Sequence, residues 1–131
     1  MDKHWNHYCT MSIVHFMAYP ATITGDGPIA ATVSKIAEDA FFGAVEITHI
    51  NDAAERQKTR DVIEAAHIRV GYGGQPLVLR GKLNPNSLEE PERKAAVAAL
   101  KAGIDEAAEV GAKRLAFLSG KDPGDKDRPA A

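Results

Sequence analysis

Short apolar runs alternate with longer segments of helical periodicity along the chain, and this alternation limits the possible folds more than any other feature. The apolar, β-branched runs cover residues 12–17, 44–48, 68–72 and 114–118. Parallel neighbours in a sheet need a crossover of a dozen or more residues, usually a right-handed helical one. The sequence therefore predicts an α/β fold in which four parallel strands are joined by helices.

The helices are delimited by residues typical of helix ends. Pro28 suits a first helical position, Asn51 or Asp52 can cap the second helix, and Ser87 with Glu90 has the spacing of a capping box. Gly111 is expected to end the third helix. Residues 75–86 are predicted to be a long loop, and a fourth helix is expected to begin near residue 127.

Two architectures fit this pattern, and the loops favour one of them. The segments after the strands are long and polar, whereas those after the helices are short, as in a (β/α)8 barrel with a working top face. Residues 19–22 lack the glycine-rich phosphate loop of a doubly wound dinucleotide fold. A full barrel takes roughly 250 residues. We therefore expect residues 11–131 to form the first half of a TIM barrel, truncated at helix four, and residues 1–10 to be a disordered leader.

The charge, cysteine content and apolar runs of the sequence limit the classes of partner that the chain is expected to bind. The formal net charge is −2, with 16 Lys and Arg against 18 Asp and Glu, so no broad basic field favours nucleic acid or an acidic membrane. Cys9 is the single cysteine, which rules out an internal disulfide and makes the cytoplasm the expected compartment. No apolar run is long enough for a membrane span. A small molecule is the expected partner.

Three stretches resemble a known superfamily. They are KIAEDAFFGAVEIT, the run VGYGGQPLVL followed by LNPNSLEEPERKAAV, and EAAEVGAKRLAFLSGKDPG. Together they look like the N-terminal half of the xylose-isomerase-like TIM barrels, the sugar phosphate isomerases and epimerases, over residues 11–131. The resemblance implies a divalent metal (Mn, Mg, Co or Zn) that assists proton transfer between adjacent sugar carbons. Its ligands lie mostly on strands five to eight, so no metal ligand is assigned in this chain.

Residues at the carboxyl ends of barrel strands point into the site, which gives the candidate residues. The candidate catalytic residues are Glu46 and His49, and the candidate substrate-binding residues are His15, Tyr19, Thr48, Gln75, Ser119 and Lys121. A carboxylate inside an apolar strand needs a polar partner or a cavity, and an imidazole can exchange protons near neutral pH. A Gln amide both donates to and accepts from polyol hydroxyls.

Several candidates also have a structural interpretation. Glu46 could pair with a cation inside the barrel, His15 is more often a hydrogen-bonded core residue, and Gln75 could brace its loop. Lys121 fits a turn better than a P-loop, because the leading glycine and its spacer are missing. His67 is predicted to face solvent.

Two functions follow. In the first, the chain supplies part of a sugar or sugar phosphate pocket to a metal-assisted isomerase or epimerase and is inactive alone. In the second, it is a non-catalytic half-barrel, a structural or binding module that self-associates through its open edges and uncovered apolar sheet surface.

Overall fold

The computed structural model describes residues 2–120, and these build a parallel four-stranded sheet in the order β1-β2-β3-β4. The strands are β1 Ser12–Val14, β2 Ala44–Ile47, β3 Arg69–Gly73 and β4 Leu115–Ala116. Helices separate consecutive strands. The predicted α/β fold with a parallel sheet is confirmed.

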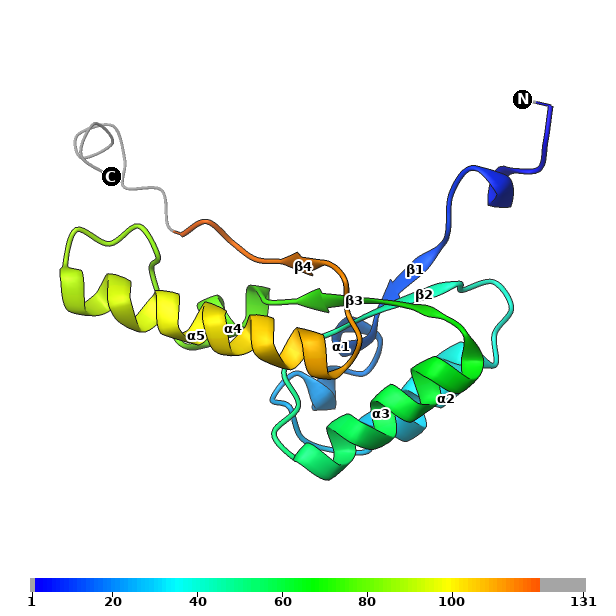
Figure 1. Cartoon of the computed structure of the whole chain (residues 1–131), viewed down its shortest axis with the longest axis horizontal. Helices are drawn as coiled ribbons and strands as arrows, with labels where there is room; N and C mark the ends of the chain where they lie inside the picture. Colours follow the sequence, from blue (N-terminus) through cyan, green and yellow to red (C-terminus); the bar gives the residue numbers. More distant parts are fainter. Residues whose placement is uncertain (1, 121–131) are drawn as a thin grey trace.

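Three of the helices cover one side of this sheet. The helices are α1 His15–Ala18, α2 Ile29–Ala37, α3 Ala53–Ala66, α4 Gln75–Arg80 and α5 Glu90–Glu109, with short 3-10 turns η1 Trp5–His7 and η2 Pro20–Thr22. Figure 1 shows α2, α3 and α5 below the strands. Their apolar faces meet the sheet in a core that includes Ile29, Val33, Ile36, Val45, Ile47, Tyr72, Ala107 and Val110.

Strand register decides which side chains enter the core. Val45 and Ile47 of β2 are completely buried and belong to the core between sheet and helices. Side chains alternate along a strand, so Glu46 between them projects from the opposite side. In the strand register, Glu46 is paired with Val14 of β1 and with Gly71 of β3. Helices α2, α3 and α5 do not lie on that opposite side, which we call the uncovered face.

The predicted ends of two helices are confirmed. The Asp52 carboxylate caps α3 by accepting a hydrogen bond from the Ala54 amide at 3.0 Å. Gly111 follows α5 with φ +80°, a left-handed conformation that costs glycine little. At the end of α3 the same conformation falls on His67, with φ 54°.

The first strand is shorter than predicted. Residues 12–17 were expected to form it, but β1 ends at Val14 and His15 opens the single helical turn of α1, where the Tyr19 amide donates to the His15 carbonyl at 2.8 Å. A short apolar run suits either a strand or a helix, and packing decides. The helical turn buries His15 and Phe16 and turns Met17 outward, 73% exposed.

Other predicted boundaries also need correction. Residues 75–86 are not one loop, because α4 occupies their first half with Pro76 in its first turn, where a missing amide hydrogen costs nothing. Pro28 precedes α2 rather than opening it. The capping box is wrong: the Ser87 hydroxyl bonds Glu92, and Glu90 pairs with Arg93. β4 is only two residues long.

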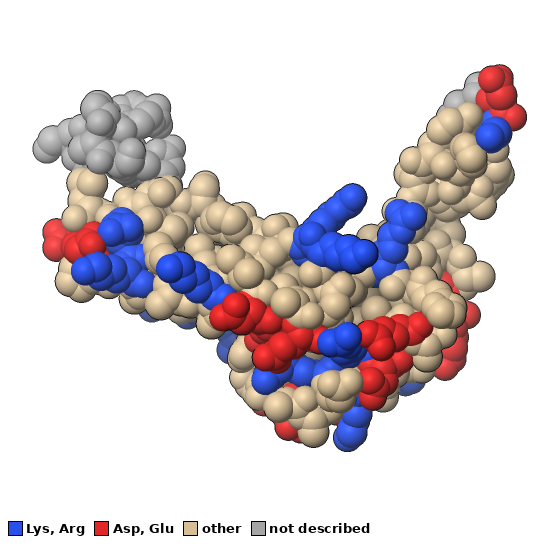
Figure 2. Space-filling model, viewed as in Figure 1, with Lys and Arg blue, Asp and Glu red and all other residues tan. Residues whose placement is uncertain are grey.

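Charge is distributed unevenly over the molecule. Figure 2 shows Asp and Glu gathered mainly over the helices, interleaved with Lys and Arg, while Lys and Arg project beyond the strands. No helix formed within residues 2–120 is long and apolar enough to cross a membrane.

Candidate functional site

Two oxygen atoms converge at the carboxyl ends of β2 and β3, on the uncovered face. Glu46 Oε1 and Gln75 Oε1 each lie 2.9 Å from the point that a Cβ on Gly73 would occupy. The two atoms are therefore separated by at most twice that distance. Phe16 closes the same point at 3.0 Å. The absence of a side chain on Gly73 leaves space for a carboxylate oxygen and an amide oxygen to approach each other. We call this position, bounded by Glu46, Gln75 and Phe16, the Gly73 floor.

One of these oxygens lacks a partner. Gln75 Oε1 is shielded from solvent and accepts no hydrogen bond from any residue in the described part of the chain. An unsatisfied buried acceptor costs on the order of 1–3 kcal/mol, so a donor at this position would be stabilising. A ligand hydroxyl fits this requirement, because it can donate to one oxygen while its own oxygen remains free for other bonds.

His15 is held inside the protein rather than in this site. Its Nε2 lies 2.7 Å from the Thr32 hydroxyl and its Nδ1 lies 3.4 Å from the Thr22 hydroxyl, with Tyr19 packed against the ring at 5.4 Å. Only 2% of the residue is exposed, and burial lowers its pKa to about 4. His15 is therefore neutral near pH 7 and makes the contacts of a core histidine.

Thr48 ties the two strand ends together. Its buried hydroxyl donates to the Gly73 carbonyl at 2.7 Å, across from β2 to β3. That bond fixes the position of Gly73 relative to Glu46, so Thr48 supports the convergence of the two oxygens without facing a ligand itself.

His49 turns away from Glu46, toward α5. Its Nδ1 lies 2.5 Å from Oε2 of Glu106, a residue of α5 that is only 7% exposed. Glu106 Oε1 accepts a second bond, from the Ile50 amide at 2.7 Å. The two predicted catalytic residues thus do not share one site: Glu46 faces the uncovered side and His49 faces the helices.

Glu106 was not predicted from the sequence, although one signal was present. It stands on the face of α5 that carries Gly103, Ala107 and Val110, where an isolated carboxylate needs a partner. Its charge also acts on Tyr72. Burial raises the pKa of the Tyr72 hydroxyl, and the negative charge of the nearby Glu106 raises it further. The Tyr72 hydroxyl and the Glu106 carboxylate are nevertheless not placed to form a hydrogen bond with each other.

Of the remaining predicted residues within residues 2–120, neither Ser119 nor Tyr19 is among the nearest neighbours of the point that a Cβ on Gly73 would occupy. Ser119 is exposed beyond β4, where its carbonyl accepts a hydrogen bond from the Asn86 amide. Lys121 lies outside the described residues. Tyr19 is half-buried against His15. His67 is exposed, as predicted.

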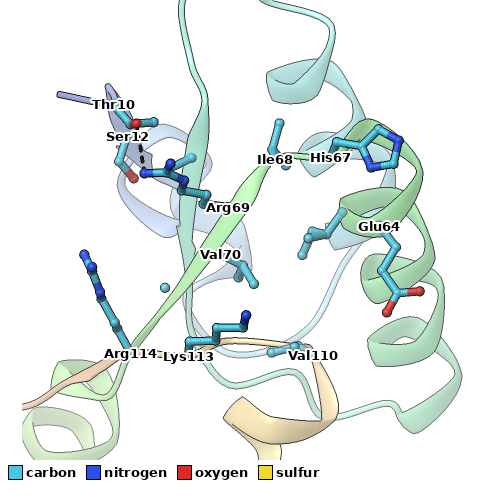
Figure 3. A pocket seen from close by; sticks show the side chains of 14 residues that line it. Thr10, Ser12, Glu64, His67, Ile68, Arg69, Val70, Val110, Lys113 and Arg114 are labelled. Carbon is cyan, nitrogen blue, oxygen red and sulfur yellow. Dashed lines mark hydrogen bonds between the residues drawn. The ribbon is translucent and has the colours of Figure 1, made fainter. Parts of the chain in front are cut away.

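A groove of about 990 Å³ opens at the amino ends of the strands, and none of the predicted site residues lines it. Figure 3 shows Arg69 and Arg114 extending on the same side of β3, with Arg69 donating to the Thr10 hydroxyl at 3.1 Å. Lys113 adds a third cation, and Glu64 pairs with Arg60. The groove starts from the first residues of the strands, opposite to Glu46 and Gln75.

No protein-family model matches this sequence, and no curated protein matches it. The functional interpretation therefore depends on the geometry of the residues themselves. Within residues 2–120, no group of three or more His, Cys, Asp and Glu side chains is arranged to hold a metal ion.

Proposed function

We propose that this chain forms the first β/α units of a xylose-isomerase-like (β/α)8 barrel and supplies the hydroxyl-binding part of a sugar or sugar phosphate site. The strand order and the helices on one side of the sheet support the barrel, since a doubly wound sheet carries helices on both sides. Ligands of such barrels bind at the carboxyl ends of the strands, where Glu46 and Gln75 lie.

The single observation that carries this proposal is the convergence of Glu46 Oε1 and Gln75 Oε1 over Gly73, with Gln75 Oε1 lacking a partner in the described residues. Neighbouring hydroxyls of a sugar each have a hydrogen to donate, and two acceptors above a floor without a side chain match such a pair. The Glu46 carboxylate supplies one of these two acceptors and can accept a hydrogen bond from a ligand hydroxyl.

A divalent metal belongs to this proposal only through the resemblance. The nearest side chains at the Gly73 floor do not fit one, because they supply a single carboxylate, from Glu46, and a single amide oxygen, from Gln75. The role proposed for this chain is therefore to bind and orient a polyol, and no chemical step of the chain is assigned to a metal.

Titration of the isotope-labelled chain with D-fructose and with its 6-phosphate tests the proposal. We expect a saturable shift of the Gln75 side-chain amide resonances, lost in Glu46→Gln, and a loss in Gln75→Leu of the sugar-induced shifts of the Gly73 and Gly74 backbone amides. Glu38→Gln is the matched control, because Glu38 is exposed at the end of α2. The proposal is wrong if neither sugar shifts Gln75 or if both site variants bind like the control.

The exposed apolar side chains favour the alternative of a self-associating module. Met17, Phe117 and Leu118 are 73%, 51% and 39% exposed. Exposed apolar surface costs about 25 cal/mol per Å², so a few hundred Å² amounts to several kcal/mol that association would recover. Sedimentation at micromolar concentration tests it: a dimer supports this function, and a compact monomer contradicts it.

A further inference from the structure

A second cavity, of about 220 Å³, lies on the helix-covered side between the end of β2 and α4. Apolar side chains of Ile23, Pro76 and Leu77 line part of it, and His49 and Arg80 supply its polar groups. Its volume corresponds to roughly seven water molecules at about 30 Å³ each. It is therefore large enough for a ligand of a few carbon atoms.

His49 reaches this cavity with a defined proton arrangement. The Glu106 carboxylate can only accept hydrogen bonds, so the 2.5 Å contact places the imidazole hydrogen on Nδ1. A neutral imidazole that donates from Nδ1 carries an acceptor lone pair on Nε2. Glu106 cannot easily rotate away, because its other oxygen holds the Ile50 amide at 2.7 Å. Glu106 is thus a positioning residue for His49.

Arg80 contributes positive charge to the same cavity. Its Nη1 donates to the Ile23 carbonyl at 2.7 Å, which orients the guanidinium and leaves further donors for a ligand. Arg80 takes part in none of the ion pairs formed among residues 2–120. An oriented guanidinium without a carboxylate partner is suited to bind a planar oxyanion.

We propose that this cavity binds a small hydroxycarboxylic acid. The ligand carboxylate pairs with Arg80, its hydroxyl donates to His49 Nε2, and its hydrocarbon part packs against Ile23 and Leu77. A singly charged carboxylate is favoured over a phosphate dianion, because the buried Glu106 charge lies just behind His49 and repels a second negative charge. This site is independent of the proposed sugar site, which lies on the other side of the sheet.

Titration of the ¹⁵N-labelled full chain with L-lactate at constant ionic strength, followed by the His49 ring nitrogens, tests the proposal. We expect the wild-type ring to be protonated on Nδ1 and lactate to shift Nε2 saturably in the millimolar range. Acetate lacks the hydroxyl and propan-2-ol lacks the carboxylate, so each is expected to bind about tenfold more weakly, as for the loss of one charged or strong hydrogen bond.

Three variants separate binding from folding. Arg80→Gln changes an exposed side chain and is expected to weaken lactate binding about tenfold, the same estimate as for one strong contact. Glu106→Gln should move the ring proton toward Nε2 and also weaken binding, whereas Asp105→Asn, its exposed neighbour on α5, should change neither. If Glu106→Gln does not fold, Arg80→Gln decides. The proposal is overturned if sodium chloride reproduces the lactate shift, if inorganic phosphate binds more tightly than lactate, if the wild-type ring proton is on Nε2, or if Arg80→Gln binds lactate normally.

Discussion

Replacing Gly73 by alanine should disturb the convergence of Glu46 and Gln75 directly. The added Cβ would lie 2.9 Å from both side-chain oxygens and 3.0 Å from a ring carbon of Phe16, closer than nonbonded atoms normally approach. Gly71 offers a matched control on the same strand and the same side of the sheet, since a Cβ there meets no atom within 4 Å.

The size of the effect follows from which atoms must move. The oxygens of Glu46 and Gln75 end flexible side chains and can swing aside, but Phe16 is 8% exposed and packed. Overpacking of this kind costs about 1–3 kcal/mol. Alanine in place of glycine in a strand gains about 0.5–1 kcal/mol of backbone entropy. We therefore expect Gly71→Ala to be neutral or slightly stabilising, and Gly73→Ala to be less stable than it by about 1–3 kcal/mol, the same overpacking cost.

Urea unfolding followed by circular dichroism measures this difference. With a slope of about 1–3 kcal/mol per molar urea, the two midpoints should differ by roughly 1 M. The sugar titration provides the second readout, because Gly73→Ala should lose the Gln75 shift while Gly71→Ala keeps it. Equal midpoints together with equal sugar binding would show that Gly73 is not the floor of a binding site.

Three further outcomes test the packing. Burial lowers the pKa of His15 to about 4 from 6.5, so the unfolded chain takes up a proton that the folded chain excludes; stability should be full above pH 6.5 and fall by up to ~3 kcal/mol toward pH 4. His15→Gln should flatten this dependence in urea unfolding, and an unchanged slope would contradict it. Ile47→Ala should cost about 2–5 kcal/mol, against under ~1 kcal/mol for the half-exposed Ile104→Ala, as measured by thermal and urea unfolding. His67→Gly should stabilise the chain by about 0.5–1 kcal/mol, because glycine adopts φ 54° without strain, and a lower unfolding midpoint would refute this.

The candidate site could be predicted only in part. The rule that residues at the carboxyl ends of parallel strands point into one site put both Glu46 and Gln75 among the candidates, because such strands bring these ends to one edge. The same rule grouped His49 with Glu46, and the structure separates them. Their sequence spacing allowed either arrangement, and the choice depended on Glu106, 57 residues after His49.

The sequence by itself determined the elements whose signals are local and repeated. The apolar spacing of Ile29, Val33 and Ile36 gave the face that α2 buries, Asp52 capped α3, and the alternation of strands with helices gave the parallel sheet. These features depend on contacts within a few residues and on chain connectivity, so a single sequence contains them.

Tertiary packing alone decided the features in which distant residues compete for one position. The run after Val14 became helical because that turn buries His15 against Thr22 and Thr32 and buries Phe16 against Gly73. The Glu106 carboxylate selected His49 and the Ile50 amide as its partners. Such choices compare the burial and hydrogen bonding of whole side chains across the fold, and those free energies depend on coordinates that no local pattern contains.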